Sequence, residues 1–362
     1  MPLFPTIGAR KSMPVSPLRV VAAHPAAPEL ADLVKRVDPG IEVVVDLDLV
    51  RPMRFSGEDP ADPRFARTAG EQAAYERLVS SADVLLGIPD GDPVMLARIL
   101  RAGAPLRWLH TLAAGGGGQI RQAGLSADEL ARVVFTTSAG VHAGPLAEFA
   151  LFGLLVGAKD LRRLQELQSR HTWGAHFTMR HLRDQTVVVL GLGAIGTETA
   201  RLLSAVGMRV LGVKRTPGPV PHVESVHGVD ELPDLLPQAD GVVVTLPGTP
   251  FTDGLLSRDL LMATKPGAVL VNVGRGTVVD EDALVEVLRS GHLRAAVLDV
   301  TAVEPLPPGS PLWTMPQVVI SPHTAAADPA AALRSAELFA ENLRRFVAGE
   351  PLRNVVDTVH FY

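Results

Sequence analysis

The sequence predicts an α/β protein with two domains, of which the second is a doubly wound domain with a parallel sheet. Three observations lead to this prediction. The chain has 362 residues, which is too long for one average domain. Short β-branched runs alternate with helical spacings of apolar residues along most of its length. A glycine-rich turn, GLGAIG, joins one such run to one such helical segment.

The first domain is expected over residues 1–140, as a small α/β domain with a mostly parallel sheet. We expect strands at 18–23, 41–45, 82–88 and 106–112 and a helix at 28–37. Residues 51–69 are rich in Pro, Asp and Arg, which is typical of an exposed loop. Residues 1–17 hold a basic pair with no apolar segment after it, so we expect a disordered leader, with Met13 as an alternative start.

The second domain is expected over residues 141–323. It opens with a long helix at 145–167, with Pro145 at the position where a missing N–H costs nothing. Strands are expected at 186–190, 209–213, 241–246, 268–273, 295–300 and 318–321, with helices at 195–206 and 282–290. This alternation is typical of a Rossmann fold. A last helix at 329–348 has no strand after it, so residues 324–362 are expected to return to the first domain.

The composition excludes several classes of function. The net charge of −5 argues against a polyanion-binding protein. The chain has no cysteine, which excludes disulfides and thiolate sites and fits a cytoplasmic location. The longest apolar run, 149–158, is about half of a membrane span. His171, His176 and His181 recur every five residues rather than every four, so no metal site is expected.

The glycine-rich turn is the first candidate for ligand binding. It directly follows the strand-like run TVVVL and opens a helix, as in dinucleotide-binding turns. Gly191 allows the tight turn, Gly193 lets the backbone approach a pyrophosphate, and Gly196 lets helix and strand pack closely. Ala194 and Ile195 begin the helix, whose N–H groups can bind the phosphates.

The residues after the next strand bear on the choice between NAD and NADP. A carboxylate there would bind the ribose 2′-hydroxyl of NAD, but the chain has Lys214, Arg215 and Thr216 instead. Two cations and a hydroxyl suit a 2′-phosphate, with the Arg215 guanidinium able to bind it bidentately. The pattern favours NADP(H), and NAD(H) stays open because both cations could simply be solvated.

Three residues downstream can carry a reaction. Arg275 follows an apolar strand and lies between two glycines, which we expect to keep its surroundings open to a ligand. Its guanidinium can bind a carboxylate and polarise an adjacent carbonyl. His323 also follows a strand and can exchange a proton near neutral pH. Glu304 follows the strand between them, where its carboxylate can fix the tautomer of His323 and stabilise the imidazolium.

The motifs GLGAIG, LPGTP, NVGRG, LDVTAVEPLP and SPHTA, in this order, resemble those of the D-isomer-specific 2-hydroxyacid dehydrogenases. The resemblance covers residues 106–349, and TSAGVHAGPLAEFAL with the basic end of the second strand is closest to the glyoxylate/hydroxypyruvate reductase branch. It implies that Arg275 binds the substrate carboxylate and keto oxygen, that His323 is the acid/base, and that Glu304 is its partner. It further implies a Rossmann domain inserted into a smaller, flavodoxin-like substrate domain, and a homodimer paired through the helix at 145–167.

The resemblance also implies where the ligands bind. It assigns Asp299 to the nicotinamide carboxamide. The remaining residues expected in the cofactor cleft are Leu246, Pro247, Thr252, Val273 and Gly274, although Thr252 could equally serve turn chemistry alone. The substrate turn is expected at Ala114, Gly115 and Gly116, whose amides can bind a carboxylate. Four glycines at 115–118, where the family has a short Ala-Gly turn, imply mobility or an altered pocket and leave the acid open.

The sequence therefore predicts a D-2-hydroxyacid dehydrogenase, an oxidoreductase that transfers a hydride between NADP(H), or less favourably NAD(H), and a small 2-keto/2-hydroxy acid. Two alternatives stay open. One is a non-catalytic NAD(H)-sensing protein on the same fold, against which the complete Arg/Glu/His set argues. The other is a dehydrogenase of a larger or phosphorylated hydroxy acid.

Overall fold

The computed structural model describes residues 17–52, 66–359 and 361, which form two compact units. One unit runs up to Ser138 and resumes at Ala332, and the other runs from Ala139 to Ala331. Residues 1–16 of the predicted leader and 53–65 of the predicted loop at 51–69 lie outside the described residues. In the described part of the chain, no helix combines the length and apolar character that a membrane crossing requires.

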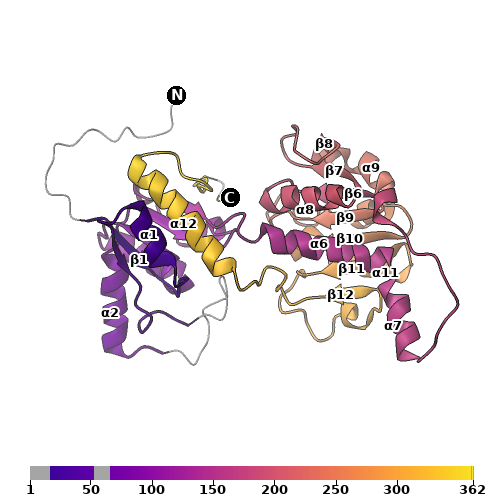
Figure 1. Ribbon diagram of the computed structural model, residues 1–362, viewed down its shortest axis with the longest axis horizontal. Helices are drawn as coiled ribbons and strands as arrows, with labels where there is room; N and C mark the ends of the chain where they lie inside the picture. The colour runs from indigo at the N-terminus through magenta and orange to yellow at the C-terminus, as the bar shows by residue number, and fades with distance from the viewer. Residues whose placement is uncertain (1–16, 53–65, 360, 362) are drawn as a thin grey trace. The chain divides into compact units, whose positions relative to one another are not determined.

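The sheet of the first unit, whose strand β1 is labelled in Figure 1, has five strands in the order β2-β1-β3-β4-β5, all paired in parallel. This is the flavodoxin-like order, in which the strand sequence reverses between β1 and β3. The strands are β1 (Arg19–Ala22), β2 (Glu42–Val44), β3 (Val84–Leu86), β4 (Trp108–Thr111) and β5 (Val134–Thr137).

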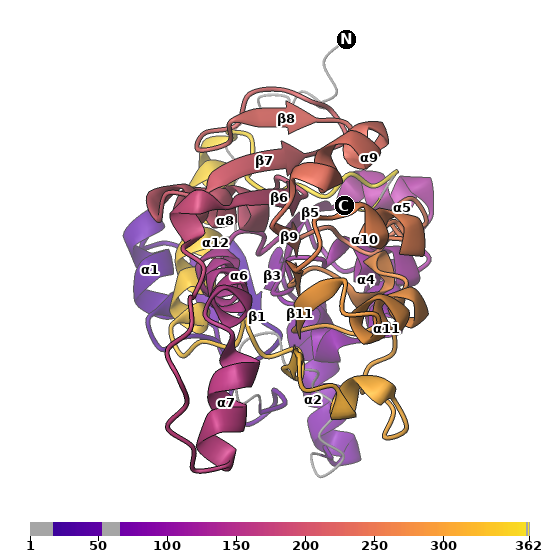
Figure 2. The same ribbon diagram turned by 90° about the vertical axis from the view of Figure 1, so that its right-hand side faces the viewer.

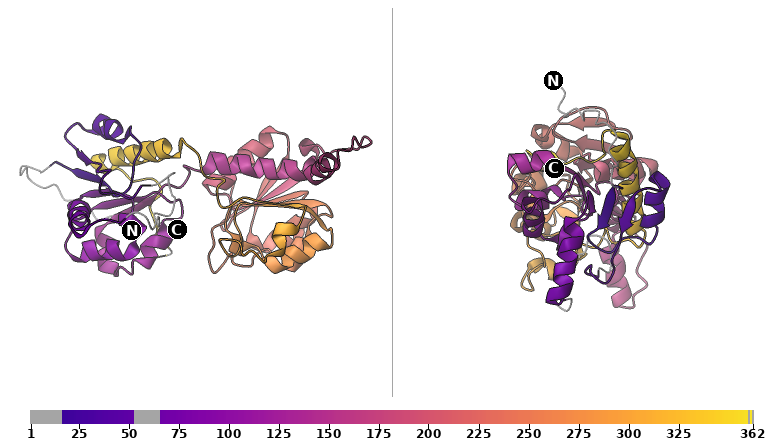
Figure 3. Two further views of the ribbon diagram at one scale, coloured as in Figure 1. Left: turned by 90° about the horizontal axis from the view of Figure 1, so that it is seen from below. Right: turned by 90° about the vertical axis from the view of Figure 1, so that its left-hand side faces the viewer.

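Helices cover both faces of this sheet. The helices are α1 (Leu30–Val37), α2 (Ala69–Ser80), α3 (Pro93–Arg101), α4 (Gly117–Gln122), α5 (Ala127–Arg132) and the closing helix α12 (Ala331–Ala348). Leu30 of α1 and Phe339 of α12 share one apolar cluster, and Tyr75 of α2 and Leu96 of α3 belong to the cluster on the other face. Figure 3 shows α12, in yellow, lying along this sheet.

The second unit has a seven-stranded parallel sheet in the order β12-β11-β10-β9-β6-β7-β8, all labelled in Figure 1. Figure 2 labels β8, β7, β6, β9 and β11 of this sheet, in that order from top to bottom. Starting from β6, the chain adds two strands on one side and then returns to the other side, which is the doubly wound Rossmann topology. The strands are β6 (Thr186–Leu190), β7 (Arg209–Val213), β8 (Ser225–His227), β9 (Gly241–Val244), β10 (Ala268–Asn272), β11 (Leu293–Leu298) and β12 (Val318–Ile320).

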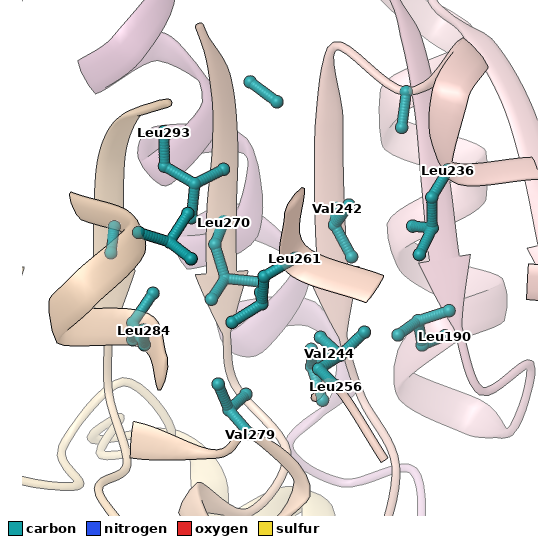
Figure 4. Close-up of a cluster of buried hydrophobic side chains, with 14 of the residues drawn as sticks. Leu190, Leu236, Val242, Val244, Leu256, Leu261, Leu270, Val279, Leu284 and Leu293 are labelled. Atoms are coloured by element: carbon teal, nitrogen blue, oxygen red, sulfur yellow. The ribbon is translucent and has the colours of Figure 1, made fainter. Parts of the chain in front are cut away.

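Each face of this second sheet carries its own core. The helices are α6 (Ala143–Ala158), α7 (Leu161–Ser169), α8 (Ala194–Ala205), α9 (Leu232–Leu235), α10 (Arg258–Ala263) and α11 (Glu281–Arg289). Leu154 of α6 and Leu203 of α8 lie in the cluster on one face. Leu261 of α10 and Leu284 of α11 lie in the cluster on the other, with Leu270 of the central sheet (Figure 4).

The structure corrects the prediction of one long helix at 145–167. The segment forms two helices, α6 and α7, because Asp160 adopts a left-handed conformation with φ 52° between them. Figures 1 and 3 show α7 and the loop after it extending beyond the second sheet. Strands β5 and β8, absent from the prediction, complete the two sheets.

Candidate active site

The predicted site residues of the second unit gather at the carboxyl edge of its sheet. Arg275 follows β10, Glu304 follows β11 and His323 follows β12, and these three strands are neighbours in the sheet. All strands of this sheet run parallel, so the loops after them meet at one edge. The topology thus brings the guanidinium, the carboxylate and the imidazole to one side of the unit.

The imidazole and the carboxylate are in direct contact. Nδ1 of His323 lies 2.7 Å from Oε2 of Glu304, and both side chains are partly exposed. The other Glu304 oxygen, Oε1, accepts a hydrogen bond of 3.1 Å from the amide of Thr301, which fixes the carboxylate. Because a carboxylate only accepts, the proton between them belongs to Nδ1, and Nε2 is left to face a reactant.

The loop that carries His323 is held by Asp299. Oδ1 of this buried carboxylate accepts hydrogen bonds from the hydroxyl of Ser321 (2.6 Å) and from the amides of Thr324 and Ala325 (both 2.9 Å). His323 itself has a left-handed backbone, with φ 52°. Ser321 was not among the residues predicted from the sequence. Its hydroxyl follows a strand and precedes His323 by two residues, and this position was the signal that could have identified it.

Arg275 is positioned by close packing on both sides. A Cβ atom at Gly274 would lie 2.6 Å from the carbonyl oxygen of Leu246, and one at Gly276 would lie 1.9 Å from the carbonyl carbon of Thr301. The two glycines therefore let this loop pack against the loops after β9 and β11. This corrects the expectation that they keep the surroundings of Arg275 open.

A buried amide completes the Arg275 loop. Nδ2 of Asn272 donates to the carbonyl of Arg275 (3.0 Å), and its Oδ1 accepts from the amide of Gly274 (3.0 Å). The guanidinium is exposed, and its Nη1 donates to the carbonyl of Gly274 (2.8 Å). The loop is thus rigid at the backbone while the charged group faces outward.

The glycine turn lies between β6 and α8, at the point where the strand order reverses. Gly191 has φ 98°, a conformation that favours glycine, and a Cβ at Gly196 would lie 1.8 Å from the carbonyl oxygen of Gly191. The hydroxyl of Thr245, after β9, donates to that same oxygen at 2.7 Å. Gly193 is exposed, and a Cβ there would meet no atom within 4 Å. Phosphates could therefore approach the backbone at Gly193 and the first turn of α8.

The other predicted cofactor residues lie around the same edge. Lys214, Arg215 and Thr216 follow β7, and the last two are exposed. The turn after β9 is braced by Thr252, whose hydroxyl donates to the carbonyl of Pro247 at 2.6 Å. Ala194, Ile195, Leu246, Val273, Gly274 and Asp299 lie in the loops and element ends at the carboxyl edges of β6, β9, β10 and β11. These placements fit a dinucleotide bound across the switch point.

The predicted substrate turn belongs to the first unit. Ala114, Gly115 and Gly116 follow β4, and α4 begins at Gly117. Two of the four glycines have a packing role. A Cβ at Gly116 would lie 2.0 Å from Oγ1 of Thr111, and one at Gly117 would lie 2.2 Å from the carbonyl oxygen of Phe361.

The remaining candidates do not form a site within the described residues. His171, His176 and His181 are exposed in or beside the loop after α7. No group of three or more potential metal ligands occurs in the described ranges.

Residues 151–325 match the family model described as the NAD binding domain of D-isomer specific 2-hydroxyacid dehydrogenases. D-3-phosphoglycerate dehydrogenase of Mycobacterium leprae is 37% identical over 226 residues, which are 62% of this chain and 42% of that protein, so the chain spans less than half the length of this relative. Glyoxylate reductase of Aeropyrum pernix is 36% identical over 238 residues, covering 62% of this chain and 70% of that one.

The fold is similar to solved structures over nearly the whole chain. A D-isomer specific 2-hydroxyacid dehydrogenase from Xanthobacter autotrophicus Py2, in complex with NADPH and MES, has a TM-score of 0.74 and 31% identity. The alignment covers 96% of this chain and 100% of that one. By its NAD-binding domain, by a relative covered over more than two thirds of its length, and by its fold, the chain belongs to the D-isomer specific 2-hydroxyacid dehydrogenase family.

Proposed function

We propose that the protein is an NAD(P)-dependent D-2-hydroxyacid dehydrogenase that interconverts a small 2-keto acid and its 2-hydroxy acid. The observation that carries this proposal is the contact of 2.7 Å between His323 and Glu304, one strand away from Arg275 at the same sheet edge. A protein that only senses a dinucleotide has no need of an imidazole held by a carboxylate beside an exposed guanidinium.

The chain's residues divide the work of the reductive direction. Arg275 binds the carboxylate of the acid and polarises its keto oxygen. Nε2 of His323 gives its proton to that oxygen as C2 accepts a hydride, and Glu304 stabilises the imidazolium that the step starts from. The nicotinamide, when bound, supplies the hydride. One keto acid, one NAD(P)H and one proton thus give one hydroxy acid and one NAD(P)⁺, and His323 recovers its proton from solvent.

NADP(H) is the proposed cofactor. The support is the cluster of Lys214, Arg215 and Thr216 after β7, at the place where an acidic residue would favour NAD. The similar Xanthobacter protein was solved with NADPH. A wide preference for NADH in steady-state kinetics would contradict the role given to these cations.

The test of the function is the oxidation of NADPH and NADH with a panel of acids. Glyoxylate, hydroxypyruvate, pyruvate, a bulky apolar 2-keto acid and a phosphorylated one cover the alternatives, the last because of the similarity to a phosphoglycerate dehydrogenase. We expect turnover of a small acid, and a loss of at least about a hundredfold in kcat for His323→Ala. Intact cofactor binding without turnover of any acid would favour the sensing protein.

A homodimer in the cytoplasm is part of the proposal. Helix α6 exposes Phe152 and Leu155, and α7 exposes Leu164, so both helices of the segment expected to pair the subunits present apolar side chains to solvent. Burying these side chains against a second copy would remove apolar surface from water. Light scattering that gives the mass of one chain at micromolar concentration would contradict the dimer. A cytoplasmic location is supported by the cysteine-free sequence, and cell fractionation tests it.

A further inference from the structure

A chain of side-chain hydrogen bonds lies buried beneath the candidate substrate turn of the first unit. It runs between β4 and β5, where His110 and Thr136 stand opposite each other in the sheet. Nε1 of Trp108 donates to the hydroxyl of Thr136 (2.8 Å), which contacts Nδ1 of His110 (2.8 Å). Nε2 of His110 contacts the hydroxyl of Ser138 (3.1 Å), and this hydroxyl donates to the carbonyl of Thr111 (2.9 Å).

The direction of every bond in this chain follows from its two ends. The hydroxyl of Thr136 accepts the indole N–H, and it donates its own hydrogen to Nδ1 of His110 when the ring carries its hydrogen on Nε2. The hydroxyl of Ser138 gives its only hydrogen to the carbonyl of Thr111, so it must accept from Nε2 of His110. The neutral imidazole with its hydrogen on Nε2 therefore satisfies all the members. The other tautomer would leave Nε2 without a donor.

The environment keeps His110 neutral. The ring is fully buried, and burial lowers the pKa of His110 to about 3. Its carbonyl accepts a hydrogen bond of 2.7 Å from the amide of Gly87, after β3, so the backbone at this point is tied to two neighbouring strands. The chain of bonds is thus a rigid, uncharged element and takes no part in proton exchange near neutral pH.

This series of hydrogen bonds ends at Thr111, whose side chain contacts the backbone of the substrate turn. Oγ1 of Thr111 donates to the carbonyl of Ala113 (3.0 Å). The same Oγ1 faces Gly116 so closely that a Cβ at Gly116 would lie 2.0 Å from it, and the amide of Gly116 donates to the carbonyl of Ala113 (3.3 Å). Thr111 therefore clamps the backbone of the turn, and the Ser138 hydroxyl holds Thr111.

We propose that His110, acting through Ser138, is a positioning residue that sets the backbone of the Thr111–Gly116 turn for binding the carboxylate of the keto acid. This inference rests on the proposed function for the identity of the ligand, but the hydrogen-bond chain stands on its own. His110 touches no reacting atom in this scheme. Its effect is on the binding of the acid, because the amides of the turn bind an anion only when they converge.

The first test needs no activity. In ¹⁵N-histidine-labelled protein, long-range ¹H–¹⁵N spectra distinguish the protonated ring nitrogen from the bare one, and His110→Gln identifies the signal. We expect His110 to carry its hydrogen on Nε2 and to show no titration between pH 5 and pH 8. A hydrogen on Nδ1, or a titration within that range, would overturn the direction of the chain.

The second test separates binding from turnover. Ser138→Ala removes the hydroxyl that joins His110 to Thr111, and we expect the KM for the keto acid to rise about tenfold, with the KM for NADPH within about twofold of the unaltered protein. Ser81→Ala is the matched control, since Ser81 also donates to a carbonyl of the same unit (Leu78, 2.7 Å), at the end of α2. Ser138→Thr keeps the hydroxyl and is expected to restore the KM.

The outcomes are distinct. An unchanged KM for the acid in Ser138→Ala, or an equal rise in Ser81→Ala, would overturn the positioning role. If Ser138→Ala does not fold, the KM of His110→Gln for the keto acid decides the case, because this variant replaces the ring that joins Thr136 to Ser138, and an unchanged KM would overturn the positioning role. Failure of the unaltered protein to reduce any keto acid would count against the proposed function, whereas the spectra would still decide whether the chain exists.

Discussion

One carboxylate oxygen of Asp299 is occupied by hydrogen bonds within the protein. The resemblance to the family assigns this carboxylate to the nicotinamide, yet Oδ1 accepts three hydrogen bonds from the loop that carries His323. His323 needs this support because its backbone has a positive φ of 52°, which costs a non-glycine residue free energy. The second oxygen, Oδ2, could serve the cofactor. Asp299 would then link the position of the acid/base to the position of the nicotinamide.

The hydroxyl of Ser321 offers a way to weaken this support without removing a charge. Ser321→Ala deletes the shortest of the three bonds, 2.6 Å, and lets the imidazole shift relative to the acid. We expect kcat to fall about tenfold, because misplacement of a reacting group by about 1 Å can cost up to about a hundredfold in rate. The KM for NADPH should stay within about twofold.

Steady-state kinetics of Ser321→Ala and Ser321→Thr check this prediction. The threonine variant keeps the hydroxyl and should recover most of kcat. Equal losses in the two variants would mean that the space around Ser321 matters and the hydrogen bond does not.

At the scale of elements, the sequence predicts best where a pattern repeats. Strands such as β6 and β10 are five residues long and fully apolar apart from Thr186 and Asn272, so β-branched runs reveal them. β8 (SVH) has only one apolar residue among three, whereas the equally short β2 (EVV) and β12 (VVI) have two and three and were predicted. The break between α6 and α7 depends on one left-handed residue, Asp160, while the apolar spacing continues across it.

The residues of the candidate site likewise divide into those that the sequence predicts and those that it does not. Arg275, Glu304 and His323 are predictable because each charged or polar side chain lies in the loop after an apolar strand. Asn272 and Ser321 are not, because Asn272 bonds to backbone groups of the Arg275 loop and Ser321 to the carboxylate of Asp299, and only the folded loops bring these groups together. The two glycines beside Arg275 could be recognised in the sequence, but their role could not. They let the loop pack against the backbone at Leu246 and Thr301, and this packing exists only in the folded protein.

Helix α6 packs on its sheet through a glycine, which makes its position testable. A Cβ at Gly157 would lie 2.1 Å from Cγ2 of Val269 on β10, whereas one at Gly144 in the same helix would meet nothing within 4 Å. Alanine favours the helix by up to about 1 kcal/mol at either position. At Gly157 overpacking costs about 1–3 kcal/mol and outweighs that gain.

We therefore expect Gly157→Ala to lower the free energy of unfolding by about 1–2 kcal/mol and Gly144→Ala to leave it unchanged or raise it slightly. Urea unfolding followed by circular dichroism measures both variants under one condition. Equal stability of the two variants would show that α6 can move away from β10 at little cost.

At the scale of the whole molecule, acid should destabilise the first unit through its buried histidines. Two histidines are buried among the described residues of this unit, and burial lowers the pKa of His24 to about 4 and that of His110 to about 3, below the ordinary value of 6.5. The unfolded chain therefore binds protons that the folded unit excludes as the pH falls from about 6.5 toward 4. Within this window the free energy of unfolding decreases with falling pH, by up to about 1.4 kcal/mol per pH unit for each histidine.

Trp108 allows the first unit to be followed separately, since the other two tryptophans, Trp173 and Trp313, lie in the second unit. In a Trp173→Phe/Trp313→Phe background, we expect urea unfolding reported by Trp108 to lose about 2–4 kcal/mol between pH 6.5 and pH 5. His24→Gln should reduce that loss by about half, and His176→Gln, at an exposed position, should leave it unchanged. An unfolding free energy of the first unit that is flat across this window would show that the two rings are protonated within the fold, at pKa values near those of the unfolded chain.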